Sequence, residues 1–111
     1  MRGMTITDTR AAQEPRWADS AASDRLWEAL YVARAEQSGD SVAALEDAAF
    51  RMYLPMARTL ARTVTPETGR DASEQAAELG LAHAVLDWRH RTSAEFRRFA
   101  RSAIIRQLLH H

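Results

Sequence analysis

The 111-residue chain contains no cysteine, no lysine, no glycine-rich segment and no long apolar run. Without cysteine there is no disulfide framework, no thiolate metal site and no cysteine nucleophile. No apolar run approaches the ~18 residues of a membrane-spanning helix, and the polar N-terminus lacks the apolar centre of a secretory signal. The length suits one domain, and we expect a soluble, cytoplasmic protein that does not enter a membrane.

The charges that are present are unevenly distributed. All fifteen Lys or Arg positions are arginine. Residues 1–87 hold nine arginines against fourteen acidic residues, a net charge of −5, and residues 88–111 hold six arginines against one acidic residue, a net charge of +5. A neutral chain with an acidic body and a basic end can bind two partners of opposite charge.

Apolar periodicity predicts four helices and no strand. Residues 1–19 are polar and aperiodic, and we interpret them as a flexible arm in which Trp17 either docks on the body or is exposed. Residues 20–111 are expected to form one domain, a compact all-α bundle. The four helices are expected at residues 23–37, from about residue 40 to a break at 65–71, at 71–88, and from residue 92 onward.

Capping residues and apolar spacing support these boundaries. Ser23 is the expected N-cap of the first helix, Gly39 its end, and Asp40 or Ser41 the cap of the second. Pro55 is expected to kink the second helix. Thr92 and Glu95 have the spacing of a capping box for the fourth. The expected buried faces are Leu26, Leu30 and Ala33; Leu45, Ala49, Met52, Met56 and Leu60; Ala72, Ala76 and Leu79; and Phe96, Phe99, Ala103, Ile104 and Leu108.

Over residues 26–109 the sequence resembles the second conserved region of bacterial sigma-70-family transcription factors. Two stretches carry the resemblance, "GDSVAALEDAAFRMYLPMARTLAR" from Gly39 and the region from Asp71 to Ile104. The matching positions are Gly39, Asp40, Tyr53, Leu54, Pro55 and Ala61, then Asp71, Gln75, Gly80, Leu81, Ala84, Trp88, Phe96, Phe99, Ala100 and Ile104.

The resemblance implies two binding surfaces and no chemistry or cofactor. The third helix of that family binds the clamp coiled-coil of the RNA polymerase core, and here Asp71, Glu74, Gln75 and Glu78 would provide the contact. Asp71, Gln75 and Glu78 also share one helical face by their spacing. An alternative explanation for Asp71 and Glu74 is that acidic residues in the first turn of a helix interact favourably with the helix dipole.

The fourth helix of the family binds promoter DNA at the −10 element. Here Arg97, Arg98, Arg101 and Arg106 would contact phosphates and Phe99 would stack on a base. The alternative interpretation is a solvated arginine face, with Phe96 and Phe99 in the core.

The sequence also departs from the family. Ser102 and Ala103 replace a Trp-Trp pair found in many promoter-melting members, which disfavours base flipping. The alternative is therefore a stand-alone sigma-like regulator that binds polymerase or an anti-sigma factor without melting a promoter, or a homo-oligomer. An unrelated helical DNA-binding protein is a third alternative.

Other candidate features are weaker. His83 and Asp87 have helical metal-ligand spacing, but no further ligand is evident, so no metal is expected. No nucleophile lies beside a base, and we expect no enzyme. Trp27 and Tyr31 are four residues apart and are expected to pack, with a regulator interface as the alternative.

Overall fold

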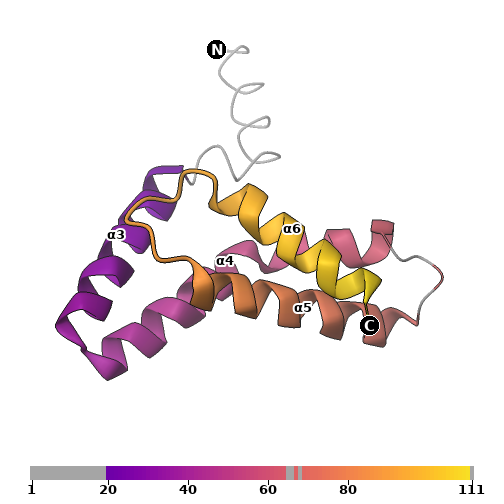
Figure 1. The fold of residues 1–111 in the computed structure, drawn as a ribbon, viewed down its shortest axis with the longest axis horizontal. Coiled ribbons are helices and arrows are strands. Elements are labelled where there is room, and N and C mark those ends of the chain that lie inside the picture. The colour runs from indigo at the N-terminus through magenta and orange to yellow at the C-terminus, as the bar shows by residue number, and fades with distance from the viewer. Residues whose placement is uncertain (1–19, 65–66, 68, 111) are drawn as a thin grey trace, which may run out of the picture.

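A computed structural model describes residues 20–64, 67 and 69–110 of the chain. In this part of the chain the fold is an all-α bundle of four helices with no strand, as the periodicity predicts (Figure 1). The arm over residues 1–19, including Trp17, lies outside the described residues. The helices are α3 (Ser20–Glu36), α4 (Gly39–Val64), α5 (Arg70–Asp87) and α6 (Phe96–Leu109).

The corner between α3 and α4 is formed by residues that the sequence does not single out. Gln37 has a left-handed backbone (φ 58°), and the Ser38 and Gln37 amides donate to the carbonyls of Ala33 (3.1 Å) and Arg34 (3.2 Å). These two hydrogen bonds form a Schellman motif, which ends α3 before Gly39. The predicted end at Gly39 is therefore wrong, because Gly39 is already the first residue of α4.

The predicted N-cap of α3 is also wrong. Ser23 lies inside the helix and is buried, and its hydroxyl is hydrogen-bonded to the Tyr53 hydroxyl at 2.8 Å. The bond links two helices across the core, so Ser23 contributes to packing and does not cap a helix end.

Helix α4 runs through Pro55 to the predicted break after Val64. The prediction that Ala49 and Leu60 are buried is confirmed, whereas Leu45, Met52 and Met56 are only half-buried at the margin of the buried face. Small residues dominate the buried face and let neighbouring helices approach closely. It consists of Ala49, Tyr53, Ala57, Leu60 and Ala61.

Helices α5 and α6 cross with almost no space between their backbones. A Cβ atom added to Gly80 would lie 2.8 Å from the Ile104 Cα and 3.0 Å from the Ala103 carbonyl oxygen. Such distances are below van der Waals contact, so only glycine fits at this point of the crossing. The residues of α5 that face the bundle are Ser73, Ala76, Ala77, Gly80, Leu81, Ala84 and Val85.

An aromatic cluster joins the other end of α6 to α3, α4 and α5. Phe96 is fully buried, and its ring centroid lies 4.6 Å from Trp27, 4.8 Å from Tyr53 and 5.5 Å from Trp88. The predictions that Phe96 and Trp27 pack in the core are confirmed. The cluster fixes where α6 begins.

The predicted capping box at the start of α6 is wrong. Glu95 immediately precedes the helix in a left-handed conformation (φ 68°), and no side chain caps α6. The linker is held by other contacts: Trp88 Nε1 donates to the Thr92 carbonyl at 3.0 Å, and the Ser93 hydroxyl donates to Asp24 of α3. These bonds keep Thr92 one turn before the helix.

Candidate functional site

The first turn and a half of α6 gathers three of the predicted DNA-binding arginines. Arg97, Arg98 and Arg101 line an open depression of about 450 Å³ together with Glu95. Positions 97 and 101 are one turn apart and position 98 is adjacent, so the three side chains leave one sector of the helix. The structure therefore brings together three guanidinium groups at an exposed surface.

Arg106 is not part of this depression. It is exposed on the same helix, but it lies five residues beyond Arg101, which places it about 140° farther around the axis. The predicted set of four arginines is thus a cluster of three with a separate fourth. A ligand that follows the depression would contact Arg106 only by curving around α6.

Phe99 lies at the exposed edge of the aromatic cluster. Its side chain is 38% exposed, and its ring centroid is 5.2 Å from that of Trp88. His90 lies on Trp88 as well, with ring centroids 4.5 Å apart. The sequence left two roles open for Phe99, packing in the core and stacking on a base. In the structure one part of its ring packs on Trp88 and another part is exposed to solvent.

The predicted polymerase-binding residues do not form one uniform acidic face. Asp71 and Gln75 are exposed, whereas Glu74 and Glu78 are half-buried at the flank of α5. Glu74 pairs with Arg70 at 3.4 Å, and Glu78 pairs with Arg58 of α4 at 3.8 Å. The negative charge of the two glutamates is therefore partly compensated within the bundle.

Two exposed leucines complete this outer face, and the sequence interpretation missed them. Leu79 is 45% exposed and Leu86 is 44% exposed, although Leu79 was expected to pack inside with Ala72. With their neighbours on the same side of the helix they form the outer seam of α5, which consists of Ala72, Gln75, Leu79, Ala82 and Leu86. The spacing between these residues alternates between three and four, as in a helix that docks along a second helix.

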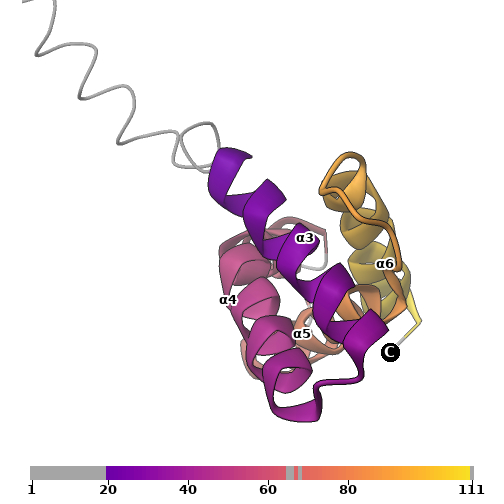
Figure 2. The same cartoon turned by 90° about the vertical axis from the view of Figure 1, so that its left-hand side faces the viewer.

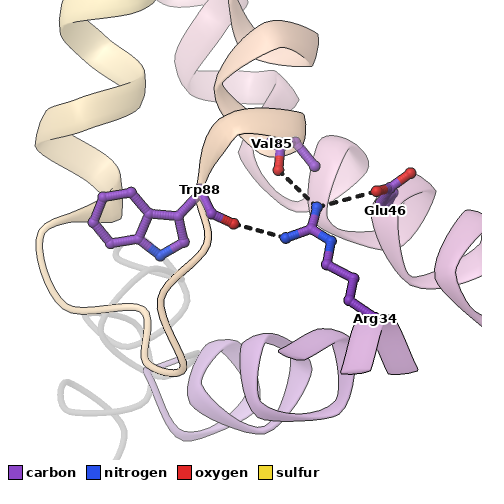
Figure 3. Close-up of polar contacts among 4 residues, drawn as sticks. All are labelled: Arg34, Glu46, Val85 and Trp88. Carbon is purple, nitrogen blue, oxygen red and sulfur yellow. Dashed lines mark hydrogen bonds and ion pairs between the residues drawn. The ribbon is translucent and has the colours of Figure 1, made fainter. Parts of the chain in front are cut away.

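Arg34 of α3 is the centre of a polar network that the sequence also does not reveal (Figure 3). Its guanidinium donates to the carbonyls of Trp88 (2.7 Å) and Val85 (3.1 Å) at the end of α5, and to Glu46 of α4 (3.0 Å). The last turn of α5 has no basic residue of its own. Arg34 therefore supplies the positive charge that favours a helix C-terminus.

Three more contacts join α3 to the linker over residues 88–95. Arg91 lies 3.6 Å from Glu28 and 4.8 Å from the centre of the Tyr31 ring, and Ser93 bonds to Asp24. With Arg34, these α3 residues recur at spacings of four, three and three and so form one helical face. Trp27 packs on the adjacent core face, while Tyr31 is 40% exposed.

The candidate metal-ligand pair on α5 gains no further ligand from the described residues. His83 and Asp87 are exposed on α5, and the described residues contain no group of three or more potential metal ligands. No helix in this part of the chain combines the length and apolar character needed to cross a bilayer.

Comparisons with protein-family models, with curated proteins and with solved structures found no match to this chain.

Proposed function

We propose that the chain is a sigma-factor-like transcription initiation domain that binds the RNA polymerase core through α5 and promoter −10 DNA through α6. The observation that carries the proposal is the presence of two chemically opposite surfaces on consecutive helices. The outer seam of α5 offers apolar anchors beside acids, and the depression on α6 offers three guanidinium groups.

The outer seam of α5 supports binding to a basic helical partner. Leu79 and Leu86 lie two turns apart on the exposed side of an 18-residue helix. Asp71 and Asp87 are exposed near its two ends. A partner helix with apolar residues at the same spacing would cover the leucines, and its basic residues would pair with the acids.

The depression on α6 supports binding to a nucleic-acid strand. Guanidinium groups bind phosphate oxygens in bidentate geometry, and the exposed edge of Phe99 provides an apolar surface on the same helix. Binding that depends on phosphate contacts falls steeply with salt concentration.

The polymerase interaction is tested by retention of core RNA polymerase on the immobilised chain. Replacing Leu79 and Leu86 together with glutamate should weaken retention at least tenfold, because the anchors are lost and the charge is placed where a partner would exclude water. Leu109→Glu is the matched control, since Leu109 is an exposed leucine on α6 (64% exposed). Equal retention by the double variant and the control would reject α5 as the polymerase surface.

A second candidate function is partner binding without promoter melting, with an anti-sigma factor or polymerase as the partner. It is favoured by Ser102, which is exposed, and Ala103, which is half-buried, because neither offers a flat ring to replace base stacking. Run-off transcription with reconstituted polymerase separates the two functions. Transcripts that depend on the added chain support initiation, and polymerase binding without transcripts supports the second function.

A further inference from the structure

Among the described residues that line the depression on α6, Glu95 is the only acidic one. Its carboxylate lies 3.4 Å from the guanidinium of Arg98, and both side chains are largely exposed (64% and 83%). An anion that entered the depression would meet the same guanidinium. The carboxylate and an incoming phosphate group therefore compete for Arg98.

The Glu95 side chain makes no hydrogen bond to the helix that follows it. A carboxylate at the residue before a helix commonly accepts hydrogen bonds from the first-turn amides. Glu95 has a left-handed backbone and makes no side-chain capping bond, so its carboxylate is engaged with Arg98. Neutralising the side chain should change the charge of the depression with little effect on the start of α6.

Arg101 differs from Arg98 in this respect. Within the described residues, Arg101 has no carboxylate partner, and it lines the same depression three residues farther along α6. A ligand that contacts Arg98 alone exchanges one anion for another and gains little. A ligand whose successive phosphates contact Arg98 and Arg101 gains an attraction that Glu95 does not cancel.

We propose that Glu95 is an intramolecular competitor for the anion site on α6, which lowers the affinity of that site for any phosphate group that contacts Arg98. A polyanion loses the same amount of binding at Arg98 but keeps its contact with Arg101. The identity of the polyanion, a nucleic-acid strand, rests on the proposed function. The competition itself rests on the geometry of Glu95 and Arg98 and applies to any phosphate ligand.

The test compares Glu95→Gln with Asp47→Asn. Asp47 is an exposed carboxylate paired with Arg51 at 2.9 Å on α4, so both variants lose one negative charge next to an arginine. Each is titrated with inorganic pyrophosphate, followed by NMR of the arginine Nε–H signals, and with a labelled single-stranded oligonucleotide, followed by fluorescence anisotropy. Glu95→Gln should bind both ligands about three- to tenfold more tightly than wild type at low salt, since one unit charge at contact distance has an effect of this order in water.

Two further readings sharpen the result. Asp47→Asn should change either affinity less than twofold, and Glu95→Gln should still tighten oligonucleotide binding in an Arg101→Gln background, because the competition is for Arg98. The salt dependence of oligonucleotide binding by Glu95→Gln should steepen by about 0.7 in log–log slope, because Arg98 becomes available for one more phosphate contact.

The outcomes separate this inference from the proposed function. If Glu95→Gln and Asp47→Asn tighten pyrophosphate binding equally, only net charge matters and the competitor role is overturned. If pyrophosphate binding tightens in Glu95→Gln alone while no variant binds the oligonucleotide, the competitor role stands and the DNA part of the proposed function fails. If wild type and Glu95→Gln bind both ligands equally, the DNA-binding surface stands and the competitor role is overturned.

Discussion

Two regions of the molecule position α6, and they differ in the kinds of contact that they make. Along its middle, α6 packs on α5 through small and apolar residues, with Gly80 against the backbone at Ile104. At its start, α6 is held by the aromatic cluster around Phe96, and the linker that leads into α6 is attached to α3 by hydrogen bonds and an ion pair. Figure 2 shows α3 running across the front of the bundle, with α6 to its right.

The difference matters because apolar packing and polar contacts respond differently to substitution and to salt. Close apolar packing is specific because a methyl group is enough to disturb it. Polar contacts at a surface are individually weak and depend on salt, whereas those that are shielded from water are costly to lose. Both surfaces of the proposed function lie on α5 and α6, and the polar contacts of the linker join this helix pair to α3.

The largest effect is expected from Arg34→Met, which removes the shielded part of the polar region. The Arg34 side chain is 13% exposed and donates to Glu46 and to two carbonyl oxygens at the end of α5. Its loss leaves these acceptors without their charged donor, and we expect the free energy of unfolding to fall by about 2–3 kcal/mol. Urea denaturation monitored by tryptophan fluorescence measures the change.

Arg25→Met is the matched control for this prediction. Arg25 is exposed on the same helix and has no ion-pair partner among the described residues, so the same substitution should change stability by less than about 0.5 kcal/mol. A loss below 1 kcal/mol for Arg34→Met would show that the network contributes no more than a surface pair.

A smaller loss is expected from Gly80→Ala in the apolar region. The new methyl group would overlap the α6 backbone, and overpacking costs about 1–3 kcal/mol. Because the overlap is with backbone atoms, we expect a cost at the upper end of this range, about 3 kcal/mol. The higher helix propensity of alanine offsets about 1 kcal/mol, so the expected net loss is about 2 kcal/mol. Gly39→Ala is the control, because a methyl group there meets nothing within 4 Å. Thermal unfolding should show a lower midpoint for Gly80→Ala alone.

The sequence was sufficient to predict the helices but not the faces that they bury. The break at 65–71 is correct to within two residues and the bounds of α5 to within one, because glycine, proline and periodicity are local signals. Leu79 was placed inside because it shares a predicted helical face with Ala72 and Ala76. The crossing at Gly80 instead favours small residues at the interface, and Leu79 remains outside.

The candidate site was predicted in the same uneven way. Arg97, Arg98 and Arg101 were found because one helix brings them together. Arg106 was grouped with them because it lies on the same helix, although its five-residue spacing from Arg101 already places it about 140° farther around the axis. The Arg34 network joins residues 12 to 54 positions apart, so no local pattern could reveal it. The capping box failed because the linker bonds to Trp88 and to α3, contacts that depend on the tertiary fold.

The smallest effect is expected from Arg91→Gln, which removes an exposed contact of the polar region. Arg91 and Glu28 are 60% and 52% exposed at 3.6 Å, so their ion pair is screened by water and salt. The contact with the Tyr31 ring adds a cation–π term of about 0.5–1 kcal/mol. We expect a total loss of about 1 kcal/mol or less, measured by urea denaturation at low and high salt. Arg91→Lys keeps the positive charge and should recover most of it. A loss as large as that of Arg34→Met would mean that the exposed contacts hold the linker as firmly as the shielded ones, and the polar region would then be as rigid as the α5–α6 crossing.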